Sequence, residues 1–180
     1  GYMDVIAAHQ HATNNVIASM GTAVTDTQLS QLKSLCDTLI LALDSDTAGK
    51  EATLRKLEET LIDSVDKNMM GFNRRIGPII RRDLVEIKIC LLPEGSDPDD
   101  LIRNDLTAWQ KLIKESVTAQ EFMIESLPRR FDLQSGSGKT AALEWISGLI
   151  YASNPFDQQN YKEKIAGKLE IEATKLDPIL

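Results

Sequence analysis

Short apolar runs and stretches of helical spacing alternate along the first half of the chain. The runs NVIASM (residues 15–20), TLILAL (38–43) and LVEIKICLL (84–92) each have the length and apolar content of a strand. TLILAL is apolar throughout after its first residue, which is typical of a parallel strand covered on both faces. Alternating strands and helices predict an α/β fold, with a parallel sheet whose strands are joined by right-handed crossovers.

Helical spacing fills the intervals between these predicted strands. Residues 3–11 (MDVIAAHQH) predict a short helix, and Thr25 with Gln28 forms a capping box at the start of a second helix. A third helix follows TLILAL, and its apolar stripe is formed by Leu54, Leu57 and Leu61.

Strands disappear from the pattern after residue 97. Asp97 is a candidate N-cap with Pro98 at the first helical position, and the helical pattern that follows is broken near Asn104. The apolar stripe of this segment consists of Leu101, Ile102, Leu106, Trp109, Leu112 and Ile113.

The remaining sequence is helical in pattern up to residue 171. A second capping box, TAQE at 118–121, opens a helix that Pro128 is expected to close. We therefore predict two domains, a sheet domain over residues 1–97 and an all-α helical bundle over residues 98–180.

Composition narrows the class of protein. Apolar residues make up 42% of the chain and charged residues 26%, as in globular proteins. No apolar stretch approaches the roughly 18 residues that a membrane span needs, and the first residues lack the basic region of a secretory signal. Cys36 and Cys90 lie inside apolar runs, so we expect two buried thiols in a reducing compartment and a cytoplasmic location.

Charge is unevenly distributed. The net charge of −7 argues against the chain as a whole being a nucleic-acid clamp. Residues 64–83, however, carry one Lys and four Arg against two Asp, a local balance of +3. A connection of this length is uncommon unless it is functional or disordered. Two interpretations stay open for its arginines, solvation or contact with phosphates; they are Arg74, Arg75, Arg81 and Arg82.

Two aspartates, Asp44 and Asp46, stand directly after the predicted strand TLILAL. Alternate strand positions face the same side, so both carboxylates share a face at the carboxyl end of the strand, where open α/β sheets bind ligands. Carboxylates held this close repel each other, and a divalent cation such as Mg²⁺ is the usual neutraliser. The pattern favours a metal site; in the alternative, one aspartate caps the following helix and the other is solvated.

The motif SDPDD supplies three more acids, Asp97, Asp99 and Asp100. An N-cap followed by first-turn acids, which the helix dipole favours, is sufficient to explain them. In addition, the third predicted strand ends just before them, so they can add carboxylates beside Asp44 and Asp46.

The stretch SGSGKT (residues 135–140) has the appearance of a phosphate-binding P-loop. Leu133, however, stands where that motif needs a glycine, and no strand precedes the stretch. We expect Ser135 or Ser137 to cap a helix that begins near Lys139.

Four stretches in this order, GYMDVIAAHQ, VIASMGTAVT, LALDSDTAGKEA and LLPEGSDPDDLIR, resemble the Toprim domain of bacterial replicative primases of the DnaG type. The helical second half, with FDLQSGSGKTAAL, is similar to the bundle that follows that domain. The resemblance covers nearly the whole chain, and the ordered set is far more specific than Asp-x-Asp alone. It implies a Toprim-type parallel sheet followed by the helical bundle.

In that family the opening motif is Glu-Gly-Tyr-Met-Asp, and its glutamate is the catalytic acid at the end of the first strand. This chain begins at Gly1, so the resemblance implies a fragment without the first strand and without this glutamate. The zinc-binding module, the basic amino-terminal half of the polymerase core and the helicase-binding domain of the family have no counterpart in the sequence.

The resemblance also implies roles for individual residues. The metal-binding and catalytic Asp-x-Asp falls on Asp44 and Asp46, and accessory metal-binding acids fall on Asp4, Asp97 and Asp99. The implied cofactor is Mg²⁺ or Mn²⁺. The implied partners are a single-stranded DNA template, ribonucleoside triphosphates and, through a domain absent here, the replicative helicase.

The implied activity is synthesis of short RNA primers on single-stranded DNA by metal-dependent nucleotidyl transfer. Alternatives are a Toprim nuclease or topoisomerase that uses the same acids for strand cleavage, and a non-catalytic fragment that binds metal or a partner. A phosphatase-like site is disfavoured because Ala48 stands where that pattern has Thr or Val. Without the glutamate, we expect the isolated chain to be inactive in priming.

Overall fold

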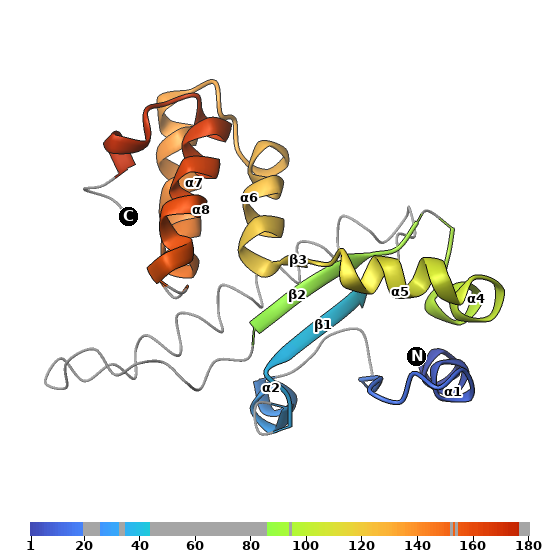
Figure 1. Cartoon of the computed structure of the whole chain (residues 1–180). Coiled ribbons are helices and arrows are strands. Elements are labelled where there is room, and N and C mark those ends of the chain that lie inside the picture. Colours follow the sequence, from blue (N-terminus) through green and yellow to red (C-terminus); the bar gives the residue numbers. More distant parts are fainter. Residues whose placement is uncertain are drawn as a thin grey trace, which may run out of the picture. The chain divides into compact units, whose positions relative to one another are not determined.

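The computed structural model describes residues 1–19, 26–32, 35–43, 86–93, 95–151, 153 and 155–176 of the chain. The chain divides into two compact units, residues 1–57 with 80–118 and residues 58–79 with 119–180. The described elements (Figure 1) are, in chain order, α1 (Tyr2–Gln10), α2 (Asp26–Leu32), β1 (Thr38–Leu43), β2 (Glu86–Leu91), α4 (Pro98–Asn104), α5 (Leu106–Lys114), β3 (Val117–Thr118), α6 (Ala119–Arg130), α7 (Gly136–Tyr151), α8 (Pro155–Leu169) and the 3₁₀ helix η1 (Ala173–Leu176). The domain boundary predicted after residue 97 stays a prediction.

The first unit is organised by a three-stranded sheet in the order β1-β2-β3. β1 and β2 are parallel, in a register that runs from Thr38 opposite Glu86 to Leu43 opposite Leu91. The α/β class and these two strands were predicted correctly. The sheet is nevertheless mixed, because the short strand β3 pairs antiparallel with β2.

Residues 15–19, predicted to form a strand together with Met20, are not in a strand; Met20 itself lies outside the described residues. The imidazole Nε2 of His9 is 3.1 Å from the backbone oxygen of Val16, and Val16 packs against the core of the first unit. A strand needs the backbone of a neighbour for its hydrogen bonds. Here the imidazole of His9 on α1 lies against the Val16 carbonyl instead, and Val16 packs on the core without joining the sheet.

Helices α4 and α5 each begin at an aspartate. Asp97 Oδ1 accepts a hydrogen bond from the N–H of Asp100 at 2.7 Å, and Asp105 Oδ1 accepts one from the N–H of Ala108 at 2.9 Å. The predicted N-cap at Asp97 and the break near Asn104 are confirmed. The break is sharp because Asp105 ends α4 with a non-helical backbone, at φ −151° and ψ 77°, and caps the start of α5 with its side chain.

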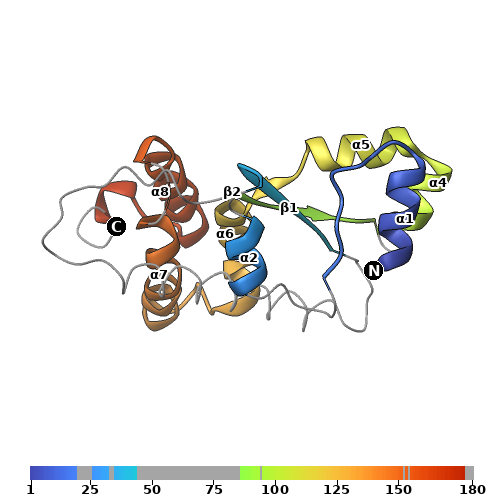
Figure 2. The ribbon, with the colours of Figure 1, turned by 90° about the horizontal axis from the view of Figure 1, so that it is seen from below.

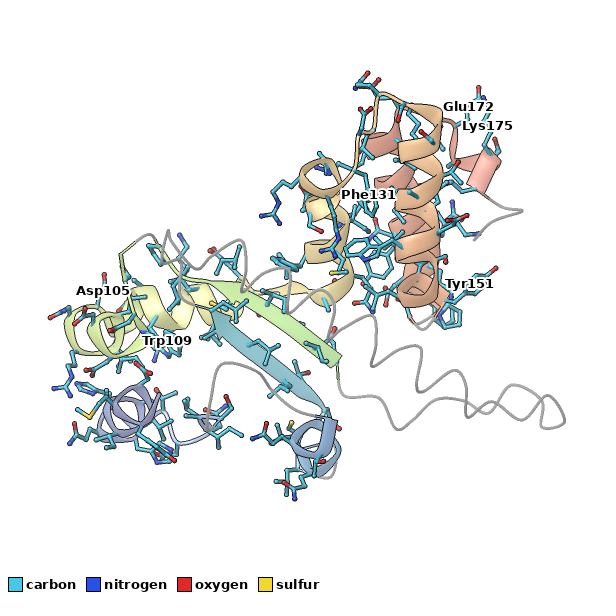
Figure 3. The ribbon with its side chains drawn as sticks, turned by 180° about the vertical axis from the view of Figure 1, so that it is seen from behind. Asp105, Trp109, Phe131, Tyr151, Glu172 and Lys175 are labelled. Carbon is cyan, nitrogen blue, oxygen red and sulfur yellow. The ribbon has the colours of Figure 1, made fainter. Side chains whose placement is uncertain are left out.

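The core of the first unit lies between the sheet and the helices α1, α4 and α5. Its buried residues are Ala7, Ala8, Cys90, Leu92, Ile102 and Trp109. Figure 3 shows Trp109 one turn after Asp105 on α5. Burial raises the pKa of the Cys90 thiol, as expected for an inert core cysteine, whereas Cys36 is half-buried. The prediction of two buried thiols is therefore confirmed for Cys90 alone.

In the second unit, α6, α7 and α8 pack against one another and η1 packs on α8. The fully buried side chains at their contacts include Met123, Leu127, Ile146, Ile165 and Leu169. Among the described residues, no helix is both long and apolar enough to cross a membrane.

Pro128 does not end α6, which continues to Arg130. The predicted helix end was therefore wrong by two residues. Proline removes one helical hydrogen bond, but the bond three residues later, from the N–H of Phe131 to the oxygen of Leu127 at 3.0 Å, is made.

The stretch SGSGKT forms a capped helix start. The Ser135 hydroxyl accepts a hydrogen bond from the Gly138 N–H at 3.0 Å and donates one to the Asp132 carbonyl oxygen at 3.1 Å. The predicted cap by Ser135 is confirmed, and α7 begins at Gly136, three residues earlier than expected. A turn and α6 precede it, so the strand of a P-loop is absent at this position.

Gly138 is required for this helix start. A Cβ atom at Gly138 would overlap the backbone of Asp132, whereas a Cβ at Gly136 has no atom within 4 Å. We expect Gly138→Ala to lower the free energy of unfolding by about 1–3 kcal/mol, as for overpacked sites. Gly136→Ala, two residues earlier in the same helix, should have little effect or a small stabilising one. Urea denaturation of the two variants tests this, and equal midpoints would contradict it.

Candidate functional site

The carboxyl ends of β1 and β2 lie at the same edge of the sheet because the strands are parallel (Figure 1). The Leu92 N–H donates a hydrogen bond to the Leu43 carbonyl oxygen at 3.2 Å, which continues the pairing one residue beyond the end of β2. Asp44 and Asp46 follow Leu43 in the sequence and lie outside the described residues.

A tight turn connects the end of β2 to α4. The Ser96 N–H donates to the Pro93 carbonyl oxygen at 3.1 Å, and Gly95 has a φ of +73°, which favours glycine over residues with a side chain. The turn is short, so the acids at the start of α4 follow the end of β2 within a few residues.

Asp4 meets the start of α4 from a distant part of the sequence. It lies on α1 three and four residues before Ala7 and Ala8, so all three share one face of that helix. Asp4 Oδ1 accepts a hydrogen bond from the backbone N–H of Asp99 at 3.2 Å, and its Oδ2 contacts the amino group of Gly1. Figures 1 and 2 both show α1 beside α4.

The side chains of Asp97 and Asp99 also have protein partners. Asp97 caps α4, and the carboxylate of Asp99 pairs with the guanidinium of Arg103 one turn later. Hydrogen bonding and charge attraction from Asp99 raise the pKa of Arg103 above its ordinary value. A carboxylate offers about four lone-pair positions, so these contacts leave room for a further ligand.

The donor types fit a hard divalent cation. Mg²⁺ prefers carboxylate oxygens, and the side chains of Asp4 and Asp99 are 20% and 23% exposed, so an ion from solvent can reach them. Within the described part of the chain, no three His, Cys, Asp or Glu side chains gather closely enough to hold a metal. A site at this edge therefore needs carboxylates beyond the described ones.

Of the predicted site residues, the structure joins Asp4 to the backbone of Asp99, in the first turn of the helix that Asp97 caps. The other predicted site residues lie outside the described part of the chain: Asp44, Asp46, Arg74, Arg75, Arg81 and Arg82. Sequence reasoning missed the partner of Asp99, although Arg103 stands at the i+4 spacing at which opposite charges meet on a helix. It gave no signal for the contact between Asp4 and Asp99, which are 95 residues apart.

Comparisons with known proteins identify the family to which the chain is related. The profile of the family described as Toprim-like matches residues 1–102. A DNA primase of Clostridium acetobutylicum is 33% identical over 172 residues, which are 95% of this chain and 26% of that protein. A DNA primase of Rickettsia typhi is 35% identical over 124 residues, 68% of this chain and 18% of that protein. The chain therefore spans about a quarter or less of the length of these relatives.

Solved structures show the same relationship. The catalytic core of the E. coli primase superposes with a TM-score of 0.70 at 26% identity, over 96% of this chain and 50% of that one. The catalytic domain of a DnaG primase bound to single-stranded DNA gives a TM-score of 0.70 at 26% identity, over 98% of this chain and 51% of that one. The chain therefore belongs to the Toprim-like family, and it corresponds to part of the catalytic core of DnaG-type DNA primases.

Proposed function

We propose that this chain carries the metal-binding half of the active site of a primase, an enzyme that synthesises RNA primers on single-stranded DNA. One observation carries the proposal. Asp4 of α1 bonds the backbone of Asp99 at the start of α4, the helix that follows the carboxyl end of β2. Asp44 and Asp46 follow β1, the parallel partner of β2, in the sequence. The relatives named DNA primase support the choice of reaction.

In the proposed reaction, the primer 3′-hydroxyl attacks the α-phosphorus of a ribonucleoside triphosphate and pyrophosphate leaves. When bound, Mg²⁺ or Mn²⁺ would lower the pKa of the hydroxyl and would stabilise negative charge on the attacking and leaving oxygens. We assign Asp44 and Asp46 as the main acids that hold the cation, with Asp97 and Asp99 as accessory acids. Asp4 lies beside them and bonds the backbone of Asp99.

The template and the substrates are proposed by analogy with the relatives. A related catalytic domain has been solved with single-stranded DNA, and such binding needs a basic groove. In this chain the +3 segment of residues 64–83, with Arg74, Arg75, Arg81 and Arg82, is the proposed contact with DNA phosphates. A replicative helicase is the expected partner of the longer protein, which we place in the bacterial cytoplasm.

The metal site can be tested on this chain by calorimetry with Mn²⁺. We expect measurable Mn²⁺ binding, which the double substitution Asp44→Asn with Asp46→Asn abolishes, because two of the carboxylate ligands lose their charge. The melting temperature should not fall, since the change also removes repulsion between two neighbouring carboxylates. Equal binding by both proteins would place the ion elsewhere and would contradict the assignment.

The reaction can be tested by incorporation of labelled ribonucleotides on single-stranded DNA with Mg²⁺. We expect no primer synthesis by residues 1–180 alone, because the catalytic glutamate that the family resemblance implies is absent from this sequence. A longer protein that contains this chain should make primers, and Asp44→Asn with Asp46→Asn should abolish the synthesis. DNA cleavage without primer synthesis would instead indicate a Toprim nuclease.

The accessory role of Asp97 can be separated from its capping role. Asn and Asp are equally good N-caps, so Asp97→Asn keeps the cap of α4 and removes the charge. Asp105→Asn is the matched control at the cap of α5. We expect unchanged melting temperatures for both variants, and weaker Mn²⁺ binding for Asp97→Asn alone. If the two variants bind Mn²⁺ equally well, Asp97 serves only as a cap.

A further inference from the structure

Every backbone N–H group in the first turn of α4 has an identified hydrogen-bond acceptor. The first helical residue, Pro98, has no N–H. The third, Asp100, donates its N–H to the side chain of Asp97 at 2.7 Å. The second, Asp99, donates its N–H to Asp4 Oδ1 at 3.2 Å. The next N–H, of Leu101, already makes the first intrahelical bond, to the Asp97 carbonyl oxygen at 3.2 Å. Asp4 therefore supplies from another helix a capping bond that α4 does not supply itself.

The face of α1 that carries Asp4 is the face turned to α4. Ala7 and Ala8, one turn after Asp4, are fully buried in the same core as Ile102 of α4, and the two helices are in contact. Small side chains at the contact let the two backbones approach, which places a short aspartate side chain within reach of the α4 backbone. By contrast Tyr2, Met3 and Ile6 of α1 are largely exposed.

We propose that Asp4 is a positioning residue, which caps α4 from α1 and thereby fixes Asp97 and Asp99 at the metal site, and that it is not itself a ligand of the ion. This inference rests on the proposed function for the identity of the site. It replaces the ligand role that the family resemblance implies for Asp4 with a role derived from its hydrogen bond.

The two roles make different demands on the side chain. A metal ligand needs the negative charge of a carboxylate, which Mg²⁺ and Mn²⁺ strongly prefer over an amide. A cap needs only an acceptor oxygen, and asparagine offers one of the same reach as aspartate. Asp4→Asn keeps the acceptor and loses the charge, whereas Asp4→Ala loses both.

The first readout is amide hydrogen exchange at Asp99, measured by NMR on residues 1–180. The Asp99 amide should be protected in the unchanged chain and in Asp4→Asn, and should exchange at least about tenfold faster in Asp4→Ala, because its acceptor is gone. Loss of the cap should also lower the melting temperature by about 2–4 °C in Asp4→Ala. A control is Asp157→Ala, which removes an exposed first-turn acid of α8 in the other unit and should leave Asp99 exchange unchanged.

The second readout is the dissociation constant for Mn²⁺ by calorimetry. We expect Asp4→Asn to bind within about threefold of the unchanged chain. Asp4→Ala should bind about 10- to 100-fold more weakly, the usual effect of losing a residue that orients metal ligands. Equal, large losses of binding in Asp4→Asn and Asp4→Ala would overturn the proposal and make Asp4 a ligand. If Asp4→Ala fails to fold, the Asp4→Asn result decides by itself.

The two readouts also separate this inference from the proposed function. If the unchanged chain binds Mn²⁺ but Asp99 exchange is the same in Asp4→Ala, the cap is wrong while the metal site stands. The other case is that the Asp99 amide exchanges faster in Asp4→Ala but not in Asp4→Asn, while neither the unchanged chain nor its variants bind Mn²⁺. The cap then stands. In that case the metal site proposed for this chain fails.

Discussion

The parallel pairing of β1 with β2 is the constraint on which the rest of the first unit depends. Parallel strands bring their carboxyl ends to one edge, and the register that ends at Leu43 opposite Leu91 fixes which residues leave the sheet there. Asp44 follows the last described residue of β1 in the sequence, and β2 leads into the turn before Asp97. Antiparallel pairing of the same two strands would send these acids to opposite ends of the sheet.

Packing then brings a third segment to this edge. The buried Ala7 and Ala8 place α1 against α4, and the Asp4 carboxylate bonds the α4 backbone. Burial of apolar surface supplies most of the free energy that holds such helices together. The hydrogen bond fixes how α1 lies against α4, because it can form at only one relative position of the two helices. Apolar packing and polar contact therefore act on the same pair of elements.

Sequence signals within one helical turn were sufficient to predict much of this arrangement. The features that were not predicted depend on contacts between residues far apart in the sequence. The cap at Asp97 and the break at Asp105 were predictable, because each depends on residues within one turn. Residues 15–19 were misassigned because a strand is defined by its neighbours, and the carbonyl of Val16 meets a histidine instead. β3 has only two residues, too few for a periodic pattern. The positions of Asp44 and Asp46 lie outside the described residues and stay predictions.

Holding several carboxylates together is costly in a chain without a bound cation, and the start of α4 reduces that cost in three ways. The helix N-terminus carries partial positive charge, backbone N–H groups donate to Asp4 and Asp97, and Arg103 pairs with Asp99. Each of these contacts stabilises a charged acid in the absence of metal. Asp4, Asp97 and Asp99 are therefore held by contacts within the fold itself. Such preorganisation is what a nucleotidyl-transfer site requires of its acids.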